Sequence, residues 1–237
     1  MQREWYLIDD EGIHALDMGS NSGEFWGQFR HPGEDAPWPP FSQLVFDAAP
    51  EAVMAAMEET GPRLGLHLQD VTQQPERWSQ AVVVAEGQEL TMVAEPSVDL
   101  DDRVVALPWA EALAAHLGCS GAYFGYDPAA STLYLTQFEG GEVTLAWSDS
   151  LMPGPSYAWV FDDQGRVQDQ DPRKFALERM GLPETSPLVD RYAFVEMELG
   201  RHLGLETISP SLEAFPIARV VEVEIAGEKG ASGEEAL

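Results

Sequence analysis

Proline and glycine divide this chain into four segments of helical length, and this punctuation constrains the fold more than any other feature. Proline is favoured at the first position of a helix, where its missing N–H has no intrahelical partner, and glycine is favoured just past the last turn. Two of the segments also have a polar capping residue, Asp171 or Ser186, directly before the proline. The pattern predicts helices over residues 50–60, 108–117, 172–180 and 187–203, which end at Gly61, Gly118, Gly181 and Gly204.

Between the predicted helices, apolar residues recur at every second position, which is typical of strands with one buried face. Leu64, Leu66 and Leu68 alternate in this way, and similar runs follow near residues 122–126, 143–147 and 221–225. Turn sequences such as EGGE at 139–142 and DDQG at 162–165 separate the later runs, as expected for hairpins. We therefore predict an α+β fold with a largely antiparallel sheet and about four helices.

Residues 43–147 contain a weak internal repeat of element order. Each half reads strand, helix, strand and hairpin, and Pro50 of the first half corresponds to Pro108 of the second. A tandem βαββ duplication predicts one sheet with both helices on the same face; coincidence is the alternative, because βαββ is a common order and the halves share little identity. In a duplicated unit one core would contain Val53, Met54, Met57, Leu113 and Leu117, packed over strand residues such as Leu66, Phe124 and Leu145.

Changes of pattern along the chain predict four segments. Proline-rich stretches separate the first three, because proline interrupts both helices and central strands. One such stretch is HPGEDAPWPP, and another lies at 148–157. The segments are an N-terminal β-meander with a proline- and tryptophan-rich loop (1–42), the possible duplicated βαββ core (43–147), C-terminal helices and a strand packed on that core (148–226), and a flexible acidic tail (227–237). Within the meander, strands are expected at 5–9, 13–18 and 25–29.

The balance of charge limits the possible partners. The chain carries 41 acidic against 13 basic side chains, a formal net charge of −28. Direct binding to nucleic acid needs clustered lysine and arginine, and a polybasic membrane anchor needs the same, so the composition argues against both. Because the acid is spread along the chain, it indicates a solvating surface, an acidic face that docks a basic protein, or a mimic of nucleic acid.

The lack of recognisable targeting signals in the sequence indicates where the protein is expected to be located. Charged residues within the first 12 positions leave no room for the apolar region of a secretory signal, and no apolar run is long enough to span a bilayer. We therefore expect a cytoplasmic protein without membrane contact. Its two lysines and single asparagine are typical of a bacterial protein from a GC-rich genome.

Motifs that would carry chemistry are missing from the sequence. It has no phosphate-binding loop, no dinucleotide fingerprint, no H-E-x-x-H zinc motif and no G-x-S-x-G nucleophile motif. Its one cysteine, Cys119, follows His116 by three positions, but no third group is available to orient the pair. The acidic run that starts at Asp162 departs from the calcium-loop pattern, because Val167 stands where that pattern needs glycine. We predict no catalytic residue, no metal ligand and no cofactor.

Two places are candidates for partner binding. Trp38 lies between prolines on a stiff loop, where an aromatic side chain is either a low-entropy anchor for a partner or a cover for the edge of the core. Asp99, Asp101 and Asp102 gather between the two proposed halves, where they form either a docking patch or a solvated turn. The same D-x-D spacing also suits a hard cation.

The favoured interpretation is a non-enzymatic acidic module that binds a basic protein, as an inhibitor or an immunity-type partner does. The alternative is an enzyme of unrecognised class that uses Asp or Glu as general acid or base in a cleft between the halves. That alternative predicts a deep pocket containing a carboxyl group whose pKa is strongly raised.

Overall fold

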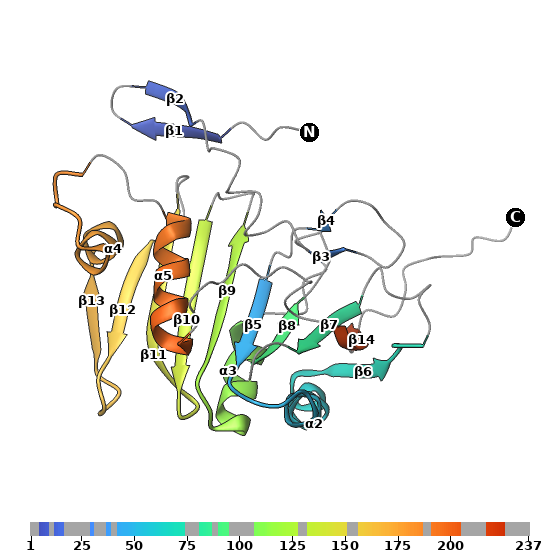
Figure 1. The fold of residues 1–237 in the computed structure, drawn as a ribbon. Coiled ribbons are helices and arrows are strands. Elements are labelled where there is room, and N and C mark those ends of the chain that lie inside the picture. Colours follow the sequence, from blue (N-terminus) through green and yellow to red (C-terminus); the bar gives the residue numbers. More distant parts are fainter. Residues whose placement is uncertain are drawn as a thin grey trace, which may run out of the picture.

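A ten-stranded antiparallel sheet organises the computed structural model (Figure 1). The structure describes residues 5–9, 12–16, 29–30, 37–38, 42–73, 81–86, 90–94, 107–127, 132–150, 156–186, 191–204 and 217–225. The strands of the sheet are β5 (Ser42–Phe46), β6 (Leu66–Asp70), β7 (Ala81–Glu86), β8 (Thr91–Ala94), β9 (Gly121–Asp127), β10 (Thr132–Glu139), β11 (Glu142–Ser150), β12 (Tyr157–Phe161), β13 (Val167–Gln170) and β14 (Ile217–Ile225). Their spatial order is β13-β12-β11-β10-β9-β5-β8-β7-β14-β6.

The predicted helices are present in the described part of the chain, and their ends follow the proline and glycine signals. They are α2 (Pro50–Thr60), α3 (Leu107–Leu117), α4 (Pro172–Met180) and α5 (Arg191–Leu203). Asp171 caps α4, because its side chain accepts a hydrogen bond from the N–H of Lys174 at 2.7 Å. The start predicted for the last helix, residues 187–190, lies outside the described residues. Four helices and an antiparallel sheet confirm the α+β fold class.

Gly61 directly follows the last residue of α2, as predicted, but the helical conformation does not stop there. Its φ of −53° is right-handed, and the chain continues into a 3₁₀ helix, η1 (Gly61–Leu64), which ends at Gly65 with φ of 75°. A Cβ at position 61 would lie 2.4 Å from the Cδ1 atom of Leu68, so a larger residue there would require the end of the Leu68 side chain to shift. The extra turn also moves the following strand, which begins at Leu66 and not at Leu64.

Helices cover both faces of the sheet. α2 and α3 contact each other and share one apolar core, whose buried members include Val53, Met57, Leu113 and Leu66. α4 and α5 lie on the opposite face, over strands β9 to β12 (Figure 1). The prediction that helices 50–60 and 108–117 share one face is therefore confirmed.

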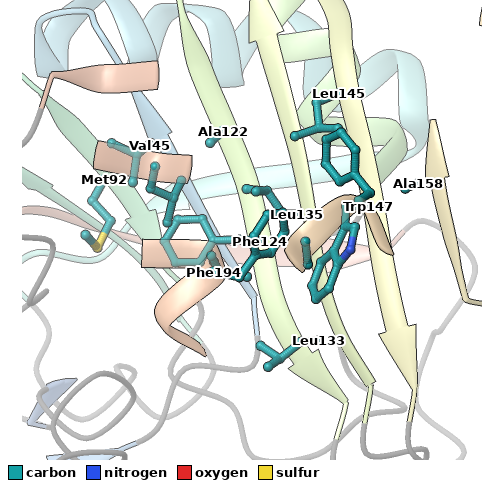
Figure 2. Packing of buried hydrophobic residues seen from close by; sticks show 14 of the residues in the cluster. Val45, Met92, Ala122, Phe124, Leu133, Leu135, Leu145, Trp147, Ala158 and Phe194 are labelled. Atoms are coloured by element: carbon teal, nitrogen blue, oxygen red, sulfur yellow. The ribbon is translucent and has the colours of Figure 1, made fainter. Parts of the chain in front are cut away.

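The opposite core contains strand residues that we expected under α2 and α3. Phe124 and Leu145 point toward α5 together with Leu135 and Trp147, and they share one cluster with Phe194 of that helix (Figure 2). Their placement under the first two helices was wrong. Because side chains alternate along a strand, the neighbours Tyr123 and Phe138 face α2 and α3 instead. Both faces of these strands are buried, so alternation alone does not identify the covering helix.

The element order of the proposed repeat is present, but duplication is not confirmed. Strands β9, β10 and β11 are neighbours in space, whereas β14 separates β7 from β6 in the first half. The first strand expected in the second half lies outside the described residues, apart from Leu107, which begins α3. The division into four segments stays a prediction, and β11 pairs directly with β12 across the proposed boundary at 148–157.

Two small hairpins precede the large sheet. In the first, β1 (Trp5–Asp9) pairs with β2 (Gly12–Leu16), close to the first two predicted meander strands. In the second, β3 (Phe29–Arg30) pairs with β4 (Pro37–Trp38). Most of the third predicted meander strand, and the predicted tail at 227–237, lie outside the described residues.

Candidate functional site

The residues predicted to bind a partner are only partly described. Trp38 lies in β4, where its backbone pairs with Phe29. Asp99, Asp101 and Asp102 lie outside the described residues. Their role in partner binding stays a prediction.

A groove of about 660 Å³ opens on the α4/α5 face of the sheet, near the turns of two hairpins. One hairpin joins β10 to β11 and the other joins β12 to β13. Apolar side chains line part of the groove, and they include Leu145, Val160 and Phe175. Arg179 of α4 and His202 of α5 are its basic residues. Its carboxylates come from the two turns, and they are Glu139, Glu142, Asp162 and Asp163.

Glycine shapes the first of these turns. Gly140 and Gly141 both have positive φ, 59° and 86°, as a two-residue hairpin loop of the primed type requires. A Cβ on Gly141 would lie 2.9 Å from the carbonyl oxygen of Ala114, so this turn rests directly against the backbone of α3. The packing holds Glu139 and Glu142 at a fixed place beside the groove.

Hydrogen bonds fix the second turn. The Asp162 carboxylate accepts from the backbone N–H groups of Gln164 and Arg166, each at 2.9 Å, and from Nε of Arg166 at 2.7 Å. The backbone bond from Arg166 is the largest of the effects that lower the pKa of Asp162. Asp162 therefore stays ionised to a lower pH than an ordinary aspartate, which favours a role as a fixed negative charge and not as a proton donor.

A buried carboxylate holds the groove residue Arg179 in place. Glu198 of α5 has a side chain that is 1% exposed, and it accepts from Arg179 through Nε at 3.0 Å and Nη2 at 2.6 Å. Nη1 of Arg201 donates to the same carboxylate at 3.1 Å. The bidentate pair of Arg179 and Glu198 connects α4 to α5. The two arginines are therefore committed to an internal ion pair.

His202 joins the end of α5 to the sheet. Its Nε2 lies 3.0 Å from the carbonyl oxygen of Gly121 and 2.8 Å from that of Phe138. Since both partners are acceptors only, Nε2 carries the proton. The side chain of Gln137 adds a bond from Nε2 to the Glu198 carbonyl oxygen at 3.1 Å. These contacts position the helix that forms one wall of the groove.

A carboxyl group with a raised pKa, that of Asp149, lies outside the groove. Burial raises the pKa of Asp149, and this effect outweighs the opposing charges of Arg191 and Arg173. Nε of Arg191 lies 3.9 Å from the Asp149 carboxylate. Asp149 is near the end of β11 that is remote from Glu142, and it is not among the residues that line the groove.

Cys119 has an environment that disfavours a nucleophile. Burial and the negative charge of Asp47 raise the pKa of its thiol, so the thiol stays protonated at neutral pH. His116 is instead directed to Glu59, with 3.8 Å between Nε2 and Oε2. Among the described residues, no three His, Cys, Asp or Glu side chains gather closely enough to hold a metal ion.

Comparison with protein-family models, with curated proteins and with solved structures finds no match. None of the described helices has the length and apolar composition that crossing a bilayer requires.

Sequence reasoning identified only part of this groove. Asp162 and Asp163 stand out as an acidic turn, and Glu139 and Glu142 stand out as the ends of another. Nothing within either turn indicates that the two turns face one groove, because it is the β11–β12 pairing that sets the two hairpins side by side. The pair of Arg179 and Glu198 has no sequence signal, since 19 positions and a helix boundary separate the two residues.

Proposed function

We propose that this protein is a non-enzymatic binding module that docks a basic protein, as an inhibitor or an immunity-type partner does, and that the groove receives a basic side chain of that partner. The observation that carries the proposal is a groove whose lining combines apolar side chains with carboxylates from two separate turns. Lysine and arginine have the matching chemistry, because an aliphatic stem ends in a charged head. The net charge of −28 would steer such a partner toward the protein.

The rigidity of the two turns supports this role. Asp162 is held by three hydrogen bonds, and Gly141 packs against α3, so both acidic turns are ordered before a partner arrives. Preorganised groups lose little conformational entropy on binding, which increases the affinity gained from each contact.

The enzymatic alternative has one observation in its favour, the raised pKa of Asp149. A general acid needs such a shift. However, Arg191 lies beside this carboxylate and stabilises its charged form. Asp149 also lies outside the lining of the groove, whereas Asp162 within the groove has a lowered pKa. The groove therefore supports the binding module better.

Titration with a lysine-rich peptide by isothermal calorimetry tests the proposal. The double variant Glu142→Gln/Asp163→Asn should weaken binding about fivefold at low salt, because two exposed ion pairs are lost. The matched control, Glu51→Gln/Glu58→Gln on the exposed side of α2, removes the same formal charge and should change the affinity little.

Binding should also weaken as salt is added, because exposed charges are screened. Equal losses in the two double variants would show that overall charge, and not the groove, attracts the peptide. An affinity that does not change with salt would contradict an electrostatic docking site altogether.

A further inference from the structure

The last described strand at one end of the sheet has an edge to which no other described strand is paired. Among the described strands β13 pairs only with β12, and Figure 1 shows it at the left end of the sheet. Its side chains are exposed or partly exposed, and Val167 is 52% exposed. An edge of this kind presents backbone N–H and C=O groups to which a further strand can pair.

The hairpin geometry identifies the backbone groups that face outward. The N–H of Asp162 donates to the carbonyl oxygen of Arg166 at 3.1 Å, so these two residues form a hydrogen-bonded pair at the turn. In an antiparallel ladder, hydrogen-bonded and non-hydrogen-bonded pairs alternate. Val167 and Asp169 therefore direct their backbone groups away from β12, while Gln168 directs its groups toward β12.

Aromatic side chains lie directly beside this edge. Tyr157 and Trp159 of β12 stack with ring centroids 4.3 Å apart, and Trp159 is 39% exposed. Nε1 of Trp159 donates to the Asp169 carboxylate at 3.1 Å, which places a carboxylate next to an exposed indole. A lysine or arginine on an added strand would meet both the negative charge and the face of an aromatic ring.

The charge around β13 selects the kind of strand that can be added. Asp162, Asp163, Asp169 and Asp171 lie along or next to the strand. Of the basic side chains nearby, Arg166 is paired with Asp162 and Lys174 with Glu184. Two acidic edges from two copies of this chain would repel each other. The opposite edge, β6, has basic neighbours in Arg63 and Arg219, so its charge is mixed.

We infer that β13 receives an extended basic segment of the partner protein as an additional strand of the sheet. Backbone hydrogen bonds to Val167 and Asp169 supply the pairing, and basic side chains next to Asp169 and Trp159 supply the selectivity. This inference rests on the proposed function, because it specifies how the basic partner is held. Strand addition can be tested separately from the groove. Pairing at the edge uses backbone atoms of β13, whereas the groove binds through its side chains.

Proline at position 167 provides the test, because it removes an outward N–H without removing a bond to β12. The probe is a short peptide of alternating lysine and valine, titrated into the full chain by isothermal calorimetry. Val167→Pro should weaken its binding about tenfold, because outward pairing is blocked. Val167→Ala keeps the N–H and should bind within about twofold of the unchanged protein.

A second experiment leaves the protein unaltered, so it does not depend on the folding of the proline variant. The same peptide is methylated on alternate backbone nitrogens, in two complementary sets. One set should abolish binding, since its methyl groups face β13, and the other should bind as the parent peptide does, since its methyl groups face solvent.

The outcomes separate the two proposals. The groove variant is Glu142→Gln/Asp163→Asn. If this variant loses affinity for the peptide, while Val167→Pro binds the parent peptide normally and the unchanged protein binds both methylated peptides normally, strand addition is overturned and the docking groove remains. If the groove variant binds normally while Val167→Pro and one methylated set fail, strand addition stands without the groove. If the parent peptide fails to bind at low salt, both proposals are overturned.

Discussion

At the scale of single residues, Glu198 is the most deeply buried charged side chain among the described residues. It is almost fully buried, and its partners Arg179 and Arg201 are about half exposed. A carboxylate in this position is stable only while both oxygens accept hydrogen bonds from charged donors. Glu198 therefore contributes to stability mainly by joining α4 to α5.

Replacing Glu198 by glutamine should lower the free energy of unfolding by about 2 kcal/mol, because charged hydrogen bonds are lost and an amide N–H₂ faces an arginine. Urea denaturation measures the loss. Glu58→Gln is the control, since it removes the same charge from an exposed position on α2. Equal stability of the two variants would show that the ion pair contributes nothing beyond net charge.

Asp149 should make stability depend on pH in a direction opposite to that of an ordinary ion-paired carboxylate. Burial raises its pKa in the folded state above the ordinary value of 3.8, so the folded protein binds this proton more tightly than the unfolded chain does. The free energy of unfolding contributed by this group therefore falls as pH rises through the interval between the two values.

Asp149→Asn removes this contribution. The variant should be more stable than the unchanged protein at neutral pH, and the difference should vanish as the pH falls below 3.8. Urea denaturation of both proteins across a series of pH values measures the difference. A variant that is less stable at neutral pH would mean that the Arg191 ion pair outweighs the cost of burial.

At the scale of elements, the β10–β11 turn offers two glycines that differ in one respect. Gly140 and Gly141 both have positive φ, but a Cβ at 140 would meet nothing within 4 Å, whereas one at 141 would meet backbone atoms of Ala114 and Ala115. Gly140→Ala should cost about 1 kcal/mol through left-handed strain. Gly141→Ala should cost about 3 kcal/mol, because the turn must also move away from α3.

Urea denaturation of the two alanine variants checks this difference. Affinity for the lysine-rich peptide should follow the same order, since displacement of the turn moves Glu139 and Glu142. Equal costs at the two positions would show that backbone conformation alone, and not the contact with α3, requires glycine in this turn.

Helix ends were predictable because their signals are local. Pro172 with its cap Asp171, and Pro50 at the start of α2, act on backbone groups within one turn of themselves. Gly61 marked the end of α2 correctly, but the 3₁₀ turn that continues to Gly65 was not predicted. It was harder to predict which helices cover each face of the sheet. The alternation of apolar residues groups Ala122 with Phe124 on one face, but it does not identify the helices that pack there.

The groove required information that the sequence does not contain locally. Each acidic turn is recognisable by itself, but the pairing of four strands brings the turns to one end of the sheet. The free edge at β13 depends likewise on the complete strand order. Only that order makes Val167 an edge residue.

At the scale of the whole molecule, one sheet belongs to two cores. The α2/α3 face and the α4/α5 face use alternate side chains of the same strands, such as Tyr123 and Phe124. The loss of packing on one face therefore loosens the strands that support the other. We expect the described sheet and its helices to unfold as one cooperative unit.

Truncation on either face tests this cooperativity. Phe124→Ala and Leu113→Ala should each lower the free energy of unfolding by about 3–4 kcal/mol, because each side chain is fully buried. Hydrogen exchange followed by mass spectrometry should show that each variant reduces amide protection in α3 and α5 to a similar extent. If Leu113→Ala reduced protection only in α2 and α3, the two cores would be separate folding units.

The position of β14 has a consequence for the order in which the chain can be completed during synthesis. β6 and β7 are translated early. In the finished sheet they do not pair with each other, because β14 lies between them. β14 is the last of the described strands to be translated. Until it emerges, nascent β6 lacks the neighbour with which it pairs, and one edge of β7 stays open to incorrect pairing. The half of the sheet that is translated first is therefore the half that is completed last, and the gap between β6 and β7 stays open until β14 has been translated.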